Sequence, residues 1–508
     1  MLKIKPKKVI MLILDGWGIA KPDKYNAIDN AKTPNFDRLM REYPNIQLRA
    51  DGPYVGLPEG QFGTSEINHG VIGTGQVVLQ DLPKINNAIE DKTFFANKTL
   101  IEACNHVKKH KSDLHIAGIL SDGNVHCSIE HAIATIELAA QEKVENVYFH
   151  AFTDGRDTPP KSAEKYLKQI QKALDAGKFK KAAISTVQGR FYLDRDREWA
   201  KTEKAVDLML KGEGMKVNDY QAAVDFSYNR NVSDEFFQQF IIDPEGLVNE
   251  KDALIFFHYR TDRMFQIQKM ILDRKVKDLK VVSFVSVFEG DKTDVAFPRT
   301  LITQTLAKTI SDAGKTQLHM TETEKFAHLT FFFNAGKETE FDGEDWAMME
   351  SNRFVKPFYN LAPSMQADKI TNKLLVAIEK DQYDFTLVNY SNTDMVGHTG
   401  SYEGAVVAAE CVDYAIGIIY EQIKDRLNEY VLIITADHGN SDIMWDYEND
   451  QPHTQHTTSP VPFILISDID CKLDPRESLE DIAPTVLELM DIKKPDVMKG
   501  SSLIVTKN

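Results

Sequence analysis

Thr435-Ala436-Asp437-His438-Gly439-Asn440-Ser441 is the stretch from which the fold of this chain can be read. It follows Tyr430 to Ile434, a short apolar run rich in β-branched residues, which is typical of a strand buried in a parallel sheet. The apolar run ends, and an aspartate and a histidine follow it directly. Open α/β sheets bind their ligands at the carboxyl ends of the strands, so this stretch predicts a site at such an edge.

The same pattern occurs at two other places in the chain. Val9 to Leu14 is an apolar run that ends at Asp15, and Phe385 to Val388 leads to Asp394, with His398 four residues later. One acid after a strand is ordinary loop chemistry. Three of them, two with a histidine close by, indicate ligands for a divalent cation that converge on one edge of a sheet.

The positions of these motifs predict the domain organisation. Asp15 lies near the start of the chain and the other two motifs lie beyond residue 390, so the two chain ends must share one domain. Between them, strand-like runs such as His115 to Leu120 alternate with helical patterns such as Ile129 to Glu142. We therefore predict an α/β protein in which residues 1–78 and 300–508 form one domain and residues 79–299 form a second α/β domain inserted in it.

Composition excludes several classes of partner and location. At 508 residues the chain is too long for one core. Its net charge of −16 disfavours a nucleic-acid partner. Its four cysteines contain no C-x-x-C pair, which disfavours disulfides or structural zinc. The first apolar run is shorter than the roughly 7–15 residues of a signal-peptide core, and no run approaches the ~20 residues of a membrane span. We expect a cytoplasmic protein that binds neither membranes nor nucleic acids.

A glycine-rich passage presents a candidate nucleophile. Gly63-Thr64-Ser65-Glu66-Ile67-Asn68-His69 lies within it, and glycines there allow sharp turns and close approach of a substrate. From the local residues alone, Ser65 is equally compatible with a nucleophile and with a helix N-cap.

The inserted segment carries arginines after successive predicted strands. The stretches are Thr153 to Asp157, Gly189 to Arg195 and Tyr259 to Arg263, and His126 follows another strand. Each arginine alone could be a surface ion pair. Their repetition favours an anion pocket, because a guanidinium matches carboxylate and phosphate groups with two parallel hydrogen bonds.

Seven motifs together resemble one family. They are L-D-G-W-G at 14–18, G-T-S-E-I-N-H at 63–69, D-G-R-D-T-P-P at 154–160, T-E-K-F-A-H at 323–328, N-T-D-M-V-G-H-T-G at 392–400, T-A-D-H-G-N at 435–440 and Q-H-T-T-S-P-V-P at 455–462. In this order, and across the whole chain, they resemble the cofactor-independent phosphoglycerate mutases. The aspartate–histidine motifs alone would mark only the wider alkaline-phosphatase-like superfamily.

The resemblance implies an alkaline-phosphatase-like domain with an inserted substrate-binding domain. The implied reaction interconverts 3-phosphoglycerate and 2-phosphoglycerate in glycolysis and gluconeogenesis, through a phosphoserine on Ser65 and without 2,3-bisphosphoglycerate. One metal would be held by Asp394, His398 and His456, and a second by Asp15, Ser65, Asp437 and His438. Mixed carboxylate and imidazole ligands suit Mn²⁺, and they are also compatible with other divalent metals.

The resemblance also assigns the residues around the substrate. Asp157 would act as acid and base on the glycerate hydroxyls, and Lys325 would offset charge on the phosphoryl group. Closure of the inserted domain would exclude water, and we expect a monomer. The residues that would hold the phosphoglycerate are His126, Arg156, Arg190, Arg195, Arg260 and Arg263.

The chain departs from the family pattern at a few positions. Thr64 replaces the usual asparagine and is a rival nucleophile beside Ser65, and Ile67-Asn68 replaces a V-G pair. The stretch from Arg190 to Arg195 is one residue shorter than usual, and His453 is a rival metal ligand or a substrate contact.

Two other functions compete with the mutase. A phosphohydrolase or another phosphomutase of the superfamily would use the same metals, but a plain phosphatase has no reason to carry the insert with D-G-R-D-T-P-P. A non-catalytic binding protein would be expected to lack the nucleophile or a ligand, yet every position is filled.

Overall fold

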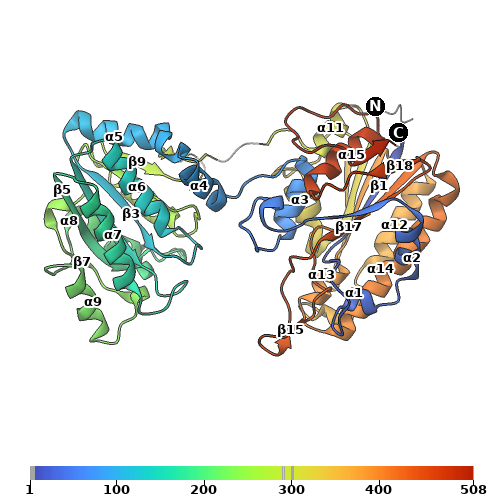
Figure 1. Ribbon diagram of the computed structural model, residues 1–508, viewed down its shortest axis with the longest axis horizontal. Helices are drawn as coiled ribbons and strands as arrows, with labels where there is room; N and C mark the ends of the chain where they lie inside the picture. Colours follow the sequence, from blue (N-terminus) through green and yellow to red (C-terminus); the bar gives the residue numbers. More distant parts are fainter. Residues whose placement is uncertain (1–5, 289, 291, 299–301, 507–508) are drawn as a thin grey trace. The chain divides into compact units, whose positions relative to one another are not determined.

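The fold is that of a computed structural model, which describes residues 6–288, 290, 292–298 and 302–506. The chain forms two compact units, residues 1–79 with 301–508 and residues 80–300. Each unit is an α/β fold around a mainly parallel sheet (Figure 1). The expected boundary at residues 299 and 300 lies outside the described residues.

The first unit is built on a seven-stranded sheet. The strands, in sheet order, are β12 (Glu344–Met349), β11 (Gln317–Glu322), β13 (Phe385–Tyr390), β1 (Lys8–Leu14), β14 (Tyr430–Thr435), β17 (Val461–Ile466) and β2 (Asn45–Leu48). The first five of these strands are parallel to one another. Strand β17 is antiparallel to β14, and β2 is antiparallel to β17.

Helices cover both faces of this sheet, which explains why its central strands are almost completely buried and mostly apolar. Helices α2 (Pro34–Glu42), α12 (Ala367–Glu379) and α14 (Tyr402–Ile423) lie on one face. Helices α3 (Ser65–Thr74), α11 (Leu306–Asp312) and α15 (Ile482–Leu489) lie on the other face (Figure 1).

Strand register brings the predicted ligands to one edge of the sheet. On β1, Leu14 pairs with Tyr390 of β13 and Ile13 pairs with Thr435 of β14, so the three strands end level with one another. Strand β11 lies beside β13 and also ends at this edge. Because β17 is antiparallel to β14, the loop that leads into β17 joins the sheet at the same edge. This loop carries His456.

The second unit has an eight-stranded sheet of its own. Among the described residues of this sheet, only the β5–β7 pair is antiparallel. In sheet order the strands are β10 (Asp294–Val295), β9 (Lys280–Ser283), β8 (Ala253–Phe256), β3 (Leu114–Leu120), β4 (Asn146–Thr153), β5 (Lys181–Gly189), β7 (Phe240–Ile241) and β6 (Met215–Lys216). Its main helices are α4 (Asp81–Glu90), α5 (Lys98–His110), α6 (Ile129–Gln141), α7 (Ala163–Ala176), α8 (Trp199–Lys211), α9 (Tyr220–Tyr228) and α10 (Met264–Asp273).

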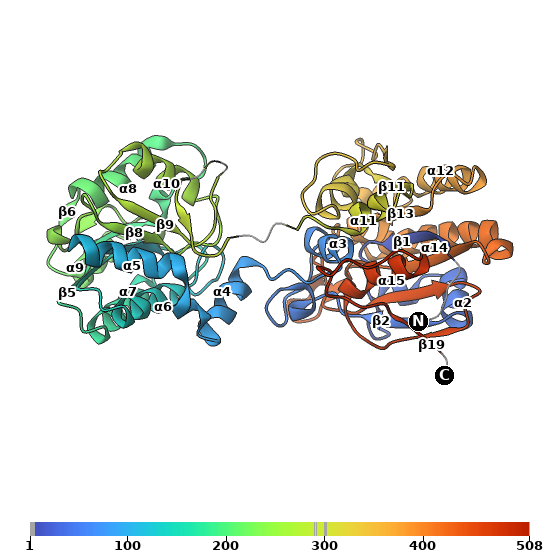
Figure 2. The ribbon, with the colours of Figure 1, turned by 90° about the horizontal axis from the view of Figure 1, so that it is seen from above.

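Figure 2 shows α8 and α10 on one face of this second sheet and α5, α6 and α7 on the other. The register again aligns strand ends: Leu120 of β3 pairs with Thr153 of β4, which pairs with Gly189 of β5. The segments that carry the predicted arginines therefore leave from one edge. Among the described residues, no helix is long and apolar enough to cross a membrane.

Candidate active site

Buried carboxylates and imidazoles form two overlapping groups at the edge of the first sheet. Asp15 follows β1, Asp437 follows β14, and Asp394 lies in α13 (Asn392–Gly397), directly after β13. In one group, ligand atoms of Asp15, Asp437 and His438 lie within 4.8 Å of one another. In the other, those of Asp394, His438 and His456 do so. His438 therefore belongs to both groups, whereas the resemblance places it in one.

The imidazole geometry fits a divalent cation. His398 Nδ1 lies 2.8 Å from the carbonyl oxygen of Thr454, and His456 Nδ1 lies 2.9 Å from that of Gly63. These contacts place the ring proton on Nδ1 and leave each Nε2 as a lone pair, the arrangement usual for metal ligands. The two Nε2 atoms are 3.1 Å apart and lie 3.2 Å and 3.3 Å from the same oxygen of Asp394. Three electron-rich atoms at such distances require a proton or a cation between them.

Two further observations support this fit. The first is that the Asp394 charge attracts positive charge to this place: burial lowers the pKa of His398 and of His456, but Asp394 outweighs burial and leaves both pKa values raised. The second concerns Asp437. Asp437 Oδ2 is buried and accepts no hydrogen bond from the described residues. It lies 3.3 Å from ring nitrogens of both His69 and His438. The donor set of carboxylates and imidazoles is one that Mn²⁺ and similar ions accept.

Ser65 and Lys325 lie between the two groups. Lys325 follows β11, is buried, and its Nζ donates to Asp15 Oδ1 at 2.7 Å, Asp394 Oδ2 at 2.6 Å and Ser65 Oγ at 2.7 Å. Ser65 Oγ also lies 2.8 Å from His438 Nε2. Burial lowers the Lys325 pKa, yet the three surrounding aspartates raise it above its ordinary value, so the ammonium stays charged.

The structure separates the roles of the two adjacent hydroxyl residues. Ser65 is the first residue of α3, and Thr64 is its N-cap, with Thr64 Oγ1 accepting from the backbone N–H of Ile67 at 3.5 Å. The hydroxyl of Thr64 thus satisfies the helix end, whereas that of Ser65 contacts the candidate ligands and Lys325.

Other polar side chains around the ligands escaped the sequence analysis. Asn389 donates to Asp15 Oδ2 at 2.7 Å, and Asn440 donates to Asp394 Oδ1 at 2.9 Å. His69 Nδ1 lies 2.9 Å from the carbonyl oxygen of Ser65. These three residues lie beside or inside the motifs quoted above. His69 lies one helical turn after Ser65 and therefore on the same face of the helix as the candidate nucleophile, and this spacing was the signal available in the sequence. His453 contributes no atom to either ligand group.

In the second unit, Arg190 is the centre of a buried charged cluster. It donates to Asp154 and Asp157 through Nη1, and its Nη2 lies 2.8 Å from His126 Nε2. Burial would raise the Asp157 pKa, but Arg190 outweighs burial and leaves that pKa lowered, so the carboxylate is ionised. Burial lowers the pKa of His126, which favours the neutral ring at neutral pH.

The remaining predicted arginines surround this cluster in different ways. Arg263 is buried, and its Nη1 donates to the carbonyl oxygen of Leu193 at 2.8 Å. Burial and nearby arginines lower its pKa to about 10. Arg195 and Arg260 both contact Asp262, an acid that the sequence analysis did not select. Arg156 is 55% exposed and pairs at 3.5 Å with Glu235.

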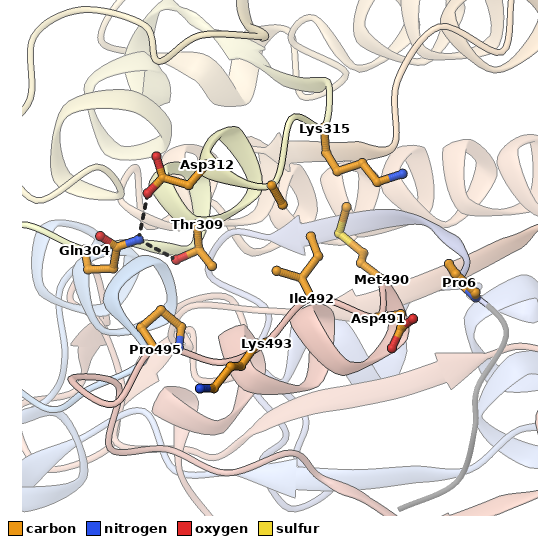
Figure 3. Close-up of a pocket in the computed structure, with 11 residues that line it drawn as sticks. Pro6, Gln304, Thr309, Asp312, Lys315, Met490, Asp491, Ile492, Lys493 and Pro495 are labelled. Carbon is orange, nitrogen blue, oxygen red and sulfur yellow. Dashed lines mark hydrogen bonds between the residues drawn. The ribbon is translucent and has the colours of Figure 1, made fainter.

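A separate open pocket of about 570 Å³ lies at the opposite edge of the first sheet. Lys315 precedes β11 and Pro6 precedes β1, so the pocket lies at the amino ends of these strands, away from the ligand groups (Figure 3). Its other lining residues are Gln304, Thr309, Asp312, Ala313, Met490, Asp491, Ile492, Lys493 and Pro495.

Comparisons with known proteins identify the family. The sequence profile of the Metalloenzyme superfamily matches residues 7–494. A 2,3-bisphosphoglycerate-independent phosphoglycerate mutase of Clostridioides difficile is 42% identical, over 98% of this chain and 99% of that protein. The chain belongs to this family. The enzyme of the same name from Acetivibrio thermocellus is also 42% identical, over 99% of this chain and 100% of that protein.

A solved structure supports the same assignment. A phosphoglycerate mutase from Leishmania mexicana, studied at low cobalt concentration, superposes with a TM-score of 0.60 at 26% identity. The match covers 100% of this chain and 99% of that one. Membership of the Metalloenzyme superfamily, together with the two ligand groups, supports the use of divalent metal ions.

Proposed function

We propose that this protein interconverts 3-phosphoglycerate and 2-phosphoglycerate through a phosphoserine on Ser65, without 2,3-bisphosphoglycerate. The observation that carries the proposal is the position of the Ser65 hydroxyl, 2.8 Å from His438 Nε2 and 2.7 Å from Lys325 Nζ. The chain's membership of the mutase family supports this choice of substrate.

The residues of the first unit suit the transfer of a phosphoryl group to and from serine. The Ser65 oxygen attacks phosphorus, the bond from phosphorus to the 3-oxygen breaks, and the serine proton ends on the released glycerate. In the second half, the oxygen of the 2-hydroxyl attacks phosphorus, the bond from phosphorus to the Ser65 oxygen breaks, and the proton of the 2-hydroxyl ends on Ser65. The Lys325 ammonium lies against Ser65 Oγ and counters negative charge on the oxygens around phosphorus in both halves.

We propose two divalent ions, most suitably Mn²⁺, at the overlapping ligand groups. His398 and His456 with Asp394 would hold one, and Asp15, Asp437 and His438 with Ser65 would hold the other. When bound, such ions supply positive charge that favours the alkoxide form of a coordinated hydroxyl. Asn389 and Asn440 donate to the ligating carboxylates and would keep them oriented.

In the second unit we propose an anion-binding role for Arg156, Arg190, Arg195, Arg260 and Arg263. Buried Nε donors of Arg190 and Arg263 have no acceptor among the described residues, which suits a carboxylate or phosphate of the substrate. Asp157 is ionised at rest and enters the cycle as a base on a glycerate hydroxyl. The negative charge of a bound substrate raises a nearby carboxyl pKa, which would let Asp157 return the proton.

Transfer of label from substrate tests this proposal. The manganese-loaded protein is incubated with [³²P]3-phosphoglycerate in the absence of 2,3-bisphosphoglycerate, and the labelled peptide is sequenced. We expect label on Ser65 and formation of 2-phosphoglycerate, and Ser65→Ala should lose both while remaining folded. The matched variant Thr64→Ala loses the helix cap, at a cost of about 1 kcal/mol, but should keep the label. Label on Thr64, or activity only with 2,3-bisphosphoglycerate, would contradict the proposal.

The monomeric state, the cytoplasmic location and the absence of nucleic-acid partners stay predictions. Cys104, Cys127 and Cys411 are free thiols, which suits a reducing compartment.

A further inference from the structure

We propose that Asp262 is a positioning residue that holds Arg195, Arg260 and the His126 ring ready for the anionic groups of the substrate. The inference rests on the proposed mutase function and adds a residue to it. Asp262 would not touch the reacting atoms itself. It would act through the three side chains that it contacts.

The geometry places one carboxylate among three segments of the second unit. Arg195 Nη1 donates to Asp262 Oδ2 at 3.1 Å, and Arg260 Nε lies 3.3 Å from the same oxygen. His126 Nδ1 lies 3.2 Å from the other oxygen, Oδ1. The backbone N–H of Arg263 also donates to Oδ1, at 2.9 Å, which fixes the direction of the carboxylate. Asp262 thereby links the segments that follow β3, β5 and β8.

The two arginines need such a partner because their side chains are long and partly exposed. The exposed fraction is 36% for Arg195 and 50% for Arg260. Free side chains of this type have large rotamer entropy, and ordering them at the moment of binding weakens affinity. Asp262 orders them in advance. For His126, the carboxylate charge 3.2 Å from Nδ1 favours a proton on that nitrogen, while Nε2 lies 2.8 Å from Arg190 Nη2.

Asp262 also has an opposing effect, because its negative charge repels an anionic substrate. Burial would raise the Asp262 pKa, but His126, Arg195 and Arg260 outweigh burial and hold that pKa well below its usual range, so the charge persists at neutral pH. Repulsion and positioning predict opposite results when the charge is removed. If repulsion dominates, Asp262→Asn tightens substrate binding. If positioning dominates, the same change weakens it.

Steady-state kinetics with 3-phosphoglycerate distinguishes the two. We expect Asp262→Asn to raise KM by about tenfold with a smaller change in kcat, and Asp262→Ala to raise KM further. Manganese content should match that of the parent protein, because Asp262 lies outside the ligand groups. Kinetics are measured at a temperature at which each variant is fully folded, because loss of an ionised carboxylate with a lowered pKa also costs stability. Glu245→Gln is the matched control, since Glu245 forms an exposed ion pair with Lys181 at 2.6 Å and lies outside the arginine cluster. It should leave KM unchanged.

Double variants test whether Asp262 acts through its arginines. In the Arg195→Ala and Arg260→Ala backgrounds, Asp262→Asn should raise KM by less than in the parent, because one of its contacts is already absent. A KM that falls or stays the same in Asp262→Asn, or effects that simply multiply in both double variants, would overturn the inference while leaving the mutase function intact. A parent protein that neither converts 3-phosphoglycerate nor labels Ser65 would instead overturn the proposed function, and this inference with it.

Discussion

At the scale of single residues, Lys325 is a buried charge that depends on its ionic partners. Its ammonium is buried and donates to two carboxylates and to the candidate nucleophile. A buried charge is tolerated only when it is paired and hydrogen-bonded, because its desolvation costs several kcal/mol. Lys325 therefore neutralises part of the repulsion among the aspartates of the two ligand groups, in addition to its proposed role in phosphoryl transfer.

We predict that Lys325→Met destabilises the metal-free protein by about 3–5 kcal/mol, the usual cost of removing one partner of a buried ion pair. Manganese should restore much of this loss, because the ion supplies positive charge among the same carboxylates. Turnover should fall by at least about a hundredfold even with metal. Denaturant unfolding with chelator and with Mn²⁺, together with mutase assays, measures these effects.

Lys356→Met is the control for this variant. Lys356 is 57% exposed and pairs with Glu324 at 2.7 Å, so its loss should cost less than about 1 kcal/mol. Equal destabilisation of Lys325→Met with and without metal would contradict the electrostatic explanation.

At the scale of secondary-structure elements, the turn after β1 determines how closely two ligand segments approach. Gly16 has a φ of +76°, and a Cβ at this position would lie 2.7 Å from both the Cα and the backbone nitrogen of Asp394. Backbone atoms cannot move aside as a flexible side chain can. A glycine is therefore required both by the left-handed conformation and by the close approach of α13 to the end of β1.

We predict that Gly16→Ala destabilises the protein by more than the ~1–2 kcal/mol that a left-handed alanine costs, and weakens manganese binding because Asp394 must shift. Gly60→Ala separates the two causes. Gly60 has a φ of +77° with nothing within 4 Å of the added Cβ, so it should show the backbone cost alone and keep its metal affinity. Thermal unfolding and metal titration provide the comparison, and identical behaviour of the two variants would contradict the steric explanation.

At the scale of the whole molecule, the chain has a separate hydrophobic core in each unit. One core contains the strands that carry the ligands, and the other contains the strands that carry the arginines. All residues of the two ligand groups belong to the first unit. A ligand stabilises the part of a protein whose folded form binds it, by about 2.7 kcal/mol when its concentration is a hundred times the Kd.

We therefore predict that manganese slows amide hydrogen exchange within residues 1–79 and 301–508 and leaves exchange within residues 80–300 nearly unchanged. The largest decrease in exchange should occur in the segments directly after β1, β13 and β14, because the proposed ligands lie there. Hydrogen-exchange mass spectrometry with manganese and with chelator measures it. The His398→Ala variant, which lacks one proposed ligand, should show a weaker response at the same metal concentration. Equal protection in both units would contradict a metal site confined to the first.

The sequence was sufficient for the α/β class and for the types of residue at each strand end. Apolar runs of strand length are visible locally because burial on both faces of a parallel sheet requires them. The ends of those runs predict that Asp15, Asp394 and Asp437 lie at one edge of a sheet. The same rule predicts that the arginine stretches of the inserted segment gather at the edge of a second sheet.

Only the tertiary structure decided which of these groups touch. Thr64 and Ser65 are adjacent hydroxyls in sequence, and their roles separate only because the start of α3 directs one to a backbone N–H and the other to Lys325. The shared position of His438, the contacts of Asn389 and the bridging position of Asp262 depend on strand register and loop packing between residues far apart in the chain. Local sequence sets periodicity and helix caps, whereas distances of about 3 Å between distant side chains arise from the packing of the whole unit.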